Sequence, residues 1–449
     1  MGTEKEDGAM IKSKYSVLIY WAMIIAMLGL FFTNDFGLVD IHKTSVVVAV
    51  GIDTEGEEVI LTAQVAVPQP SQSGDNIQYT EVQGRGLTIA DCLNEINSKT
   101  GFYPKLLSCK LILLGEECKS EELFRVLGCF YRRNYSELTA QVAMCKGKAS
   151  DMLSMPATIS PENSTAMQRA LSEELKKSAN VSSVNLKDIA FSNYSVSEAC
   201  YMPFIEANIQ GTSAGGGNGD HVGGDKPQQG DSGGQSGQSG GSSGSSGGSS
   251  EGSGGGQSGQ SGGSSGSSGG GQSGGQSGGQ PVEFTARKTA VFSGGKFAGI
   301  LDESQSFALN LIKNDIRLAV VPCDTEDEVH YTIGLKQAGG GIKLKVNDGV
   351  PELTVSFKAK AQIQGAKKVM QPDSVKYDDS LKPEVLKAVN DEVISRLQQL
   401  ISFCAENNCD VLGVKQLLHK FNYKYFEAFE KDLLTRMSVN YKVDIKSLN

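Results

Sequence analysis

The chain has 449 residues, with 51 acidic side chains against 42 basic ones and a formal net charge of −9 at pH 7. Binding to nucleic acid needs an excess of clustered Lys and Arg, so this charge balance argues against a nucleic-acid partner. The four histidines are His42, His221, His330 and His419, and their wide separation argues against a His-rich metal site.

An apolar, uncharged segment occupies residues 15–32 and follows a short tail at residues 1–14. As a helix it would span about 27 Å, close to the thickness of the hydrocarbon core of a bilayer. Lys12 and Lys14 precede it and Asp35 follows it, which predicts a cytoplasmic tail and an exported remainder. A cleaved signal peptide is the alternative, but the run is long for one and no small-residue cleavage site follows it. We therefore favour an uncleaved, single-pass transmembrane anchor.

The next residues predict a β-hairpin and a capped helix. Two β-rich runs, at residues 45–53 and 59–67, are joined by a short polar connector. Thr88 and Asp91 have the spacing of a capping box, so a helix is expected to begin at Thr88. Gly101 is suited to end that helix.

Strand and helix patterns then continue to about residue 200. The apolar run 106–114 predicts a strand buried on both faces, and helices are expected at residues 121–134, capped by Ser120, and at residues 160–179. Strands that alternate with helices predict a mixed sheet covered by helices. Residues 43–200 are therefore expected to form an α/β region of one or two lobes.

Residues 211–280 consist almost entirely of Gly, Ser and Gln. No aliphatic or aromatic side chain occurs between Gly223 and Gln280, so this part cannot form a core. A β-rich run at residues 201–209 precedes the segment and another at residues 287–292 follows it. We interpret the segment as a disordered linker inserted between two strands.

The remaining residues, 281–449, predict an α+β domain. Three runs alternate apolar with polar residues, and these are 329–335, 342–346 and 353–363. With Gly-rich connectors between them, they predict a three-stranded antiparallel meander with one buried face. An apolar stripe along residues 383–406 predicts a helix that covers this face. A second helix at residues 421–437 and a last strand at residues 439–445 are also expected.

Catalytic motifs are missing from the sequence. It contains no phosphate-binding loop, no GxSxG and no HExxH. Gly84 and Gly86 lack the third glycine of a dinucleotide site, and the SGGK sequence at residues 293–296 is more typical of a hairpin turn than of an anion site. Catalysis needs titratable groups that converge, so we predict no enzyme activity, no catalytic residue, no cofactor and no metal site.

The isolated polar residues have ordinary structural interpretations. His330 and His419 are expected to be solvated, and Asp410 is expected to cap the element that follows it. Arg132 and Arg133 are the one compact basic feature of the first half, for which capping or a surface ion pair competes with a partner or lipid contact. The nine cysteines include no CxxC pair and lie mostly in apolar runs, so we expect mostly free thiols and no zinc site.

Several stretches together resemble a known family. They are KTSVVVAVGID, GLTIADCLNEI, KLLSCKLILLGEE, FYRRNYSELTAQVAMCKGKASDML, KTAVFSGGKFAGILDESQSFALNLI and the closing AENNCDVLGVKQLLHKF to VDIK. Their order and spacing resemble the Ger(x)C spore germination proteins, the C subunits of germinant receptors in endospore-forming bacteria. The resemblance extends from Lys43 to Ser447 apart from the linker.

The resemblance implies an α+β chain of several mixed or antiparallel sheets, each packed with helices. It implies a non-enzymatic subunit of a nutrient germinant receptor that acts in spore germination with A-type and B-type receptor subunits. Together with the expected anchor, it would place the folded part on the outer face of the spore inner membrane.

The chain departs from the family in two places. Members typically carry a lipidated Cys, whereas the first cysteine here is Cys92, and the linker replaces a short turn. An exported, membrane-tethered solute- or cell-wall-binding protein is the alternative function.

Overall fold

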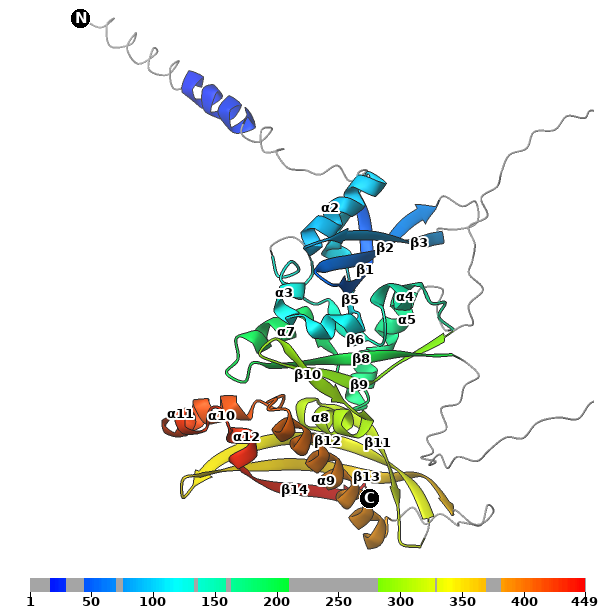
Figure 1. Ribbon diagram of the computed structural model, residues 1–449, viewed down its shortest axis with the longest axis vertical. Helices are drawn as coiled ribbons and strands as arrows, with labels where there is room; N and C mark the ends of the chain where they lie inside the picture. The colour runs from blue at the N-terminus through cyan, green and yellow to red at the C-terminus, as the bar shows by residue number, and fades with distance from the viewer. Residues whose placement is uncertain are drawn as a thin grey trace, which may run out of the picture. The chain divides into compact units, whose positions relative to one another are not determined.

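The protein is described from a computed structural model (Figure 1). The described residues are 17–29, 44–69, 76–132, 136–158, 163–209, 282–327, 329–368 and 381–448. The expected tail at residues 1–14 and the expected linker at residues 211–280 lie outside them. The described residues on the two sides of the expected linker belong to one compact unit.

Residues 17–29, inside the expected anchor at residues 15–32, form a helix. Its side chains are largely exposed, including Trp21 at 59% and Met27 at 74%. Among the described residues, no helix is both long enough and apolar enough to cross a membrane. The transmembrane anchor stays a prediction from the sequence.

The larger of two sheets is mixed and has ten strands. Its strands are β1 (Thr44–Glu55), β2 (Glu58–Gln69), β3 (Asn76–Gly86), β4 (Tyr103–Lys105), β5 (Leu111–Leu114), β6 (Gln141–Cys145), β7 (Val184–Asn185), β8 (Ala199–Ile209), β9 (Val282–Ser293) and β10 (Lys296–Leu301). The order is β10-β9-β8-β6-β5-β1-β2-β3, with β4 beside β1 and β7 beside β6. The four strands β1, β5, β6 and β8 are parallel, and antiparallel strands extend the sheet on both sides. This confirms the expected mixed sheet.

Strand β5 is buried on both faces, as its uniformly apolar sequence predicts. Leu111 and Leu113 pack into one apolar cluster, whereas Ile112 and Leu114 pack into a second cluster on the opposite face. All four side chains are completely buried. Burying such a side chain stabilises a fold by about 1.5–3 kcal/mol, so β5 anchors both layers that cover the sheet.

Short helices cover the larger sheet. They are α2 (Ile89–Thr100), η2 (Leu106–Ser108), η3 (Glu116–Ser120), α3 (Leu123–Leu127), α4 (Ala149–Ser154), α5 (Asn163–Ala170), α6 (Glu173–Lys177) and α7 (Leu186–Asn193). The capping box predicted for α2 is confirmed, because Thr88 Oγ1 accepts from the backbone N–H of Asp91 and the Thr88 N–H donates to the Asp91 carboxylate. Gly101 ends the helix with a φ of 70°.

Two helices are shorter than the sequence predicts. The helix expected at residues 121–134 is reduced to α3, since Glu121 and Glu122 are extended. The helix expected at residues 160–179 is interrupted at Ser172, whose backbone is extended and separates α5 from α6. A buried apolar side chain lies next to each break. Leu123 follows Glu122 and is 2% exposed, and Leu171 precedes Ser172 and is 1% exposed.

Strands β8 and β9 are neighbours although residues 210–281 separate them in the chain. They pair antiparallel from Ala199 opposite Ser293 to Ile209 opposite Val282. The SGGK sequence then forms a tight hairpin turn into β10, with positive φ at Gly294 and Gly295. Strands β9 and β10 therefore belong to the larger sheet.

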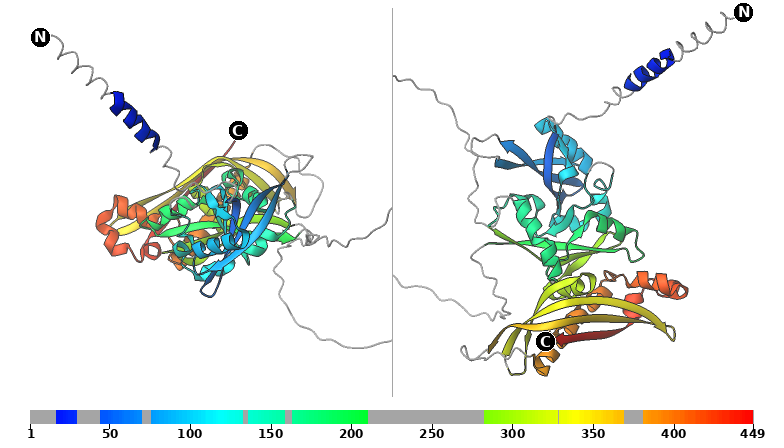
Figure 2. Two further views of the ribbon diagram at one scale, coloured as in Figure 1. Left: turned by 90° about the horizontal axis from the view of Figure 1, so that it is seen from above. Right: turned by 180° about the vertical axis from the view of Figure 1, so that it is seen from behind.

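The smaller sheet has four strands in the order β11-β12-β13-β14. They are β11 (Ile316–Asp324), β12 (Val329–Asn347), β13 (Val350–Lys368) and β14 (Ser438–Ser447). The first three are antiparallel, and β14 runs parallel to β13. The associated helices are α8 (Glu303–Lys313), α9 (Pro383–Glu406), α10 (Val414–Phe421), η4 (Tyr423–Tyr425), α11 (Phe426–Phe429) and α12 (Leu433–Arg436). Figure 2 shows the long strands of this sheet in yellow and β14 in dark red.

The predicted three-stranded meander is wrong. Strand β12 does not turn at its Gly-rich segment but continues through it, pairing with β13 along both strands apart from two register shifts. One shift lies between Lys336 and Gly339, so Gln337 and Ala338 form a bulge, and the glycines after it pair in register with β13. A Cβ atom at Gly340 would lie 2.5 Å from the carbonyl oxygen of Leu311. The glycine is therefore needed for close approach of α8 to the strand.

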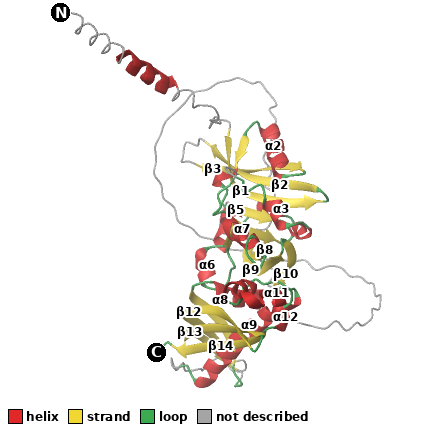
Figure 3. Cartoon of the chain, turned by 90° about the vertical axis from the view of Figure 1, so that its left-hand side faces the viewer, coloured by secondary structure: helices red, strands yellow, loops and turns green. Residues whose placement is uncertain are grey.

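Helix α9 covers the smaller sheet as predicted (Figure 3). Its buried stripe includes Val385, Val389 and Leu397, which share a core with Phe357 of β13. The single helix expected at residues 421–437 is instead divided among the end of α10, η4, α11 and α12. Together, the two sheets and their helices confirm an α+β fold.

A buried polar network fixes α8 against the larger sheet. The Ser182 hydroxyl lies 2.8 Å from Thr289 Oγ1 and donates to Asn310 Oδ1 at 3.0 Å. Asn310 Nδ2 in turn donates to the carbonyl of Ala179 at 2.9 Å. Each of these buried groups has a partner, and the network therefore orients α8 without leaving a desolvated donor or acceptor.

Candidate functional site

A cleft of about 440 Å³ lies between α7 and the start of α10. Figure 1 shows α10 below α7. One wall comes from α7 and the turn before β8, and the other from the end of α8 and residues 410–416. The cleft is thus built by elements attached to both sheets.

Asp410 lies at the base of the cleft and is only 2% exposed. Its carboxylate accepts from the backbone N–H groups of Gly413, Val414 and Lys415 at 2.7–3.0 Å. The Ser197 hydroxyl donates to it at 2.6 Å. Burial raises the pKa of Asp410, and these donors partly offset that effect. The prediction that Asp410 caps the following helix is confirmed.

Lys313 brings a positive charge to the same cleft from the end of α8. Its Nζ donates to the carbonyl of Leu412 at 3.0 Å. Desolvation lowers the pKa of Lys313, whereas the charge of Asp410 acts in the opposite direction. The ammonium group therefore holds the loop that follows α9 through this hydrogen bond, which is a structural role and not a proton-transfer step.

Hydroxyl groups line the upper part of the cleft. Ser192 and Ser195 donate to the backbone carbonyls of Ile189 and Ser192, so both hydroxyls are held by their own turn. Burial raises the pKa of Tyr201 to about 12. No histidine lines this cleft, and the Ser197 hydroxyl is bonded to the Asp410 carboxylate, which also accepts three backbone hydrogen bonds.

One exposed aromatic ring lines the cleft and a second lies near it in the chain. Phe191 is 72% exposed and lines the opening, and Tyr194, three residues later, is 88% exposed. The sequence did not single out either ring, nor Ser197 and Lys313. The contacts that define the cleft join residues 99 and 213 positions apart, so no local pattern reveals them.

A second cleft, of about 890 Å³, lies between the end of β11 and the first turns of α9. Its lining is rich in carboxylates, and His330 Nδ1 lies 2.7 Å from Asp324 Oδ1. Both side chains are substantially exposed, which agrees with the solvated role expected for His330. In the parts of the chain that are described, no group of three or more His, Cys, Asp or Glu side chains is arranged to hold a metal ion.

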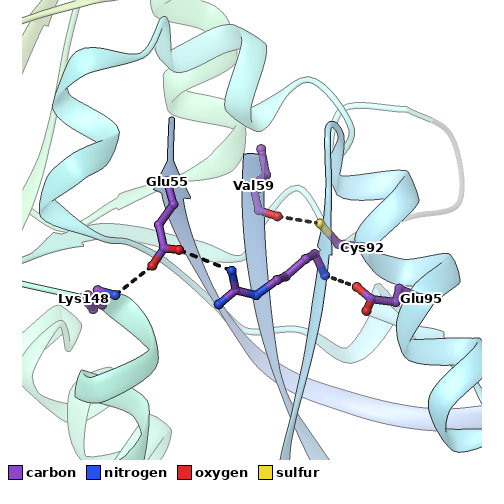
Figure 4. Close-up of polar contacts among 6 residues, drawn as sticks. Glu55, Val59, Cys92, Glu95 and Lys148 are labelled. Carbon is purple, nitrogen blue, oxygen red and sulfur yellow. Dashed lines mark hydrogen bonds and ion pairs between the residues drawn. The ribbon is translucent and has the colours of Figure 1, made fainter. Parts of the chain in front are cut away.

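A polar network joins the β1–β2 hairpin to its neighbours (Figure 4). Glu55 bridges the Lys148 ammonium at 2.9 Å and the Arg85 guanidinium at 3.3 Å. The backbone N–H of Arg85 donates to Glu95 of α2, and the Cys92 thiol donates to the carbonyl of Val59. The hydrogen bond from Lys148 lowers the pKa of Glu55. These charges are exposed, and such surface pairs contribute little stability.

The remaining sequence candidates have structural roles. Gly84 and Gly86 lie in β3, where a Cβ atom would lie 2.2 Å from the Cys92 carbonyl oxygen and 2.4 Å from Asp91 Cβ, respectively. They permit close packing of α2, which is not the geometry of a phosphate cradle. Arg132 is exposed, and Arg133 lies outside the described residues. His419 packs against aromatic rings of η4 and α11.

All nine cysteines are free, and eight of them are buried. Desolvation raises the pKa of Cys92 to about 11 and that of Cys118 to about 12. Cys129 is half-buried, and its pKa is also raised by desolvation. Buried thiols in such surroundings are weak nucleophiles and packing residues.

We expect the native protein to react slowly with iodoacetamide at pH 7. Alkylation requires the thiolate, and a thiol with a pKa near 11 has about 300-fold less of it than an ordinary cysteine. Cys129 should be modified first, and all nine sites should react once the chain is unfolded in guanidinium. Mass spectrometry of timed samples measures this order. Rapid modification of several sites in the native protein would contradict the burial described here.

Two family models match the chain. "Spore germination protein N-terminal domain" matches residues 38–207, and "Spore germination B3/ GerAC like, C-terminal" matches residues 287–448. Among solved structures, "Crystal Structure of the GerBC protein" is similar at 12% sequence identity and a TM-score of 0.46, covering 89% of this chain and 97% of that chain. A search of curated proteins found no match.

Proposed function

The chain belongs to the Ger(x)C family of germinant receptor C subunits, and from this premise we propose that it is a non-enzymatic subunit of a nutrient germinant receptor held at the spore inner membrane. The observation that carries the proposal is the pair of family matches, one on each side of the expected linker and in the family's order. The receptor partners would be the A-type and B-type subunits implied by the family.

The cleft supports a role in binding rather than in turnover. The Asp410 carboxylate accepts four hydrogen bonds, and Lys313 Nζ donates one to a backbone carbonyl. The Ser197 hydroxyl is one of these donors, and the three backbone donors that share the carboxylate favour a structural role for Asp410 over that of a catalytic base. These hydrogen bonds connect the segment before β8 with the start of α10 and so join the two sheets.

Disruption of the gene tests the function directly. Germination triggered by nutrients should become slower, whereas germination triggered by agents that bypass the receptor should be unchanged. Restoring the gene should restore the nutrient response. Equal impairment of both routes would contradict the proposal and favour a general role in the spore coat or cortex.

We propose that residues 15–32 anchor the protein as a single transmembrane helix, with the folded part outside the inner membrane. The absence of a cysteine before Cys92 removes the lipid attachment used elsewhere in the family, and one acyl chain would bind a membrane only marginally. The full-length protein should pellet with membranes and resist extraction with high salt. A mature N-terminus after Phe32 in a freely soluble protein would identify a signal peptide instead.

The domain organisation is also a proposal, in which residues 211–280 are an insertion that folding does not need. Deleting residues 214–279 would leave six residues to join Ile209 to Val282, which are direct partners in the sheet. Shortening the loop about twelvefold lowers the entropic free-energy cost of closing it by about 2 kcal/mol, which favours folding. The melting temperature of the deletion variant should be equal or higher. Loss of cooperative unfolding would show that the segment is structural.

A further inference from the structure

Exposed rings and lysines form a ridge on α10 and η4. We define the aromatic–basic ridge as His419, Lys420, Phe421, Tyr423 and Lys424, all of which are exposed. Phe421 is 65% exposed and Tyr423 is 61% exposed, although both are large and partly or wholly apolar. Val414 and Leu418 of α10 are buried in the core of the smaller sheet, whereas the ridge residues, at the end of α10 and in η4, are exposed to the surroundings.

Contacts within the ridge hold the rings and the charges together. The His419 and Tyr423 rings meet edge to face at 5.1 Å between centroids. Lys420 Nζ lies 5.1 Å from the centroid of Phe421, and Lys424 Nζ lies 4.6 Å from the centroid of Tyr425. Each lysine is therefore placed beside an aromatic ring, and the ridge combines apolar area with positive charge.

The charge of this segment is opposite to that of the whole chain. Residues 414–426 contain three lysines and no Asp or Glu, whereas the chain has a net charge of −9. The first acidic residue after the segment is Glu427. A local positive surface on an acidic protein is complementary to a negatively charged partner.

We propose that the aromatic–basic ridge docks on an anionic lipid surface, with Phe421 and Tyr423 at the level of the headgroups and the lysines beside lipid phosphates. An acidic protein would also match the lysines. The exposed rings beside them, however, require a surface with an apolar layer directly beneath a negatively charged one, and a bilayer supplies both. This contact is additional to the proposed N-terminal anchor and goes beyond the receptor function proposed above.

A fluorescent probe at the ridge tests the contact in the full-length chain. Trp21 is the only tryptophan, so Trp21→Phe combined with Phe421→Trp leaves a single indole, at position 421. With vesicles of phosphatidylcholine and phosphatidylglycerol, the emission should shift to shorter wavelength and be quenched by brominated acyl chains. With phosphatidylcholine alone, or at high salt, both effects should be much smaller.

Matched lysine variants separate a specific contact from general charge. Lys420→Gln with Lys424→Gln should weaken docking of the ridge about 30-fold, at about 1 kcal/mol for each lysine. Lys358→Gln with Lys360→Gln removes the same charge from exposed positions of β13 and should leave docking unchanged. A probe that stays unshifted and unquenched while the protein pellets with anionic vesicles would overturn the proposal. Equal quenching in the two double lysine variants would overturn it as well. An emission shift that occurs only with spore membranes containing the receptor would assign the ridge to a protein partner instead.

Discussion

Replacing Gly340 by alanine is expected to destabilise the protein by about 3 kcal/mol, the upper range for forcing extra atoms into a packed core. The new Cβ atom would lie 2.5 Å from the carbonyl oxygen of Leu311 and 2.9 Å from the Cα of Ile312. Both are backbone atoms of α8, so no side-chain rotation relieves the clash. Either α8 moves away from β12 or the pairing of β12 with β13 is distorted at Gly340.

The neighbouring glycine provides a matched control. A Cβ atom at Gly339 would meet nothing within 4 Å, so Gly339→Ala should change stability by less than about 0.5 kcal/mol. Urea unfolding of the two variants, followed by circular dichroism, measures the difference between them. Equal midpoints for Gly339→Ala and Gly340→Ala would show that α8 does not pack closely on β12 at Gly340.

Replacing Asp410 by alanine is expected to destabilise the protein by about 4 kcal/mol. The change leaves three backbone N–H groups and the Ser197 hydroxyl without their acceptor in a buried site. It also leaves the Lys313 ammonium without the nearby carboxylate that offsets its desolvation. Since these partners come from both sides of the cleft, the start of α10 should become loose relative to β8.

Asp302 provides the control for Asp410, because it also caps a helix but is exposed to solvent. Its carboxylate accepts from the Gln305 N–H at 2.8 Å at the start of α8, and water can replace that acceptor. Asp302→Ala should therefore cost only about 1 kcal/mol, typical of a helix cap. Thermal unfolding at pH 7 compares the two variants. If both lose the same stability, the contacts between Asp410 and the region of Ser197 contribute little.

Elements fixed by nearby residues could be predicted from the sequence. The capping box of Thr88 and Asp91, the apolar run of β5 and the stripe of α9 each depend on contacts a few residues apart or on burial of one face. For the same reason the sequence located the turn at Gly294, where the hairpin itself requires a positive φ.

Features that depend on distant partners could not be predicted. The glycines of β12 have the composition of a turn, yet the strand continues through them, paired with β13 and packed against α8 at Gly340. The cleft depends on the hydrogen bond from Ser197 to Asp410 across 213 positions, which leaves no periodic signal in either segment. The interruption at Ser172 likewise reflects burial of Leu171 rather than a helix-breaking residue.

The pairing of β8 with β9 has a consequence for newly synthesised chains. When Ile209 has been made, the partner of β8 on that side is still absent, because residues 210–281 must be added first. At typical rates of synthesis this takes on the order of ten seconds. During that interval β8 has an open edge to which a strand of another copy can add. Recovery of the native protein should therefore depend on the concentration of incomplete chains, and slower expression should favour correct closure of the sheet over aggregation.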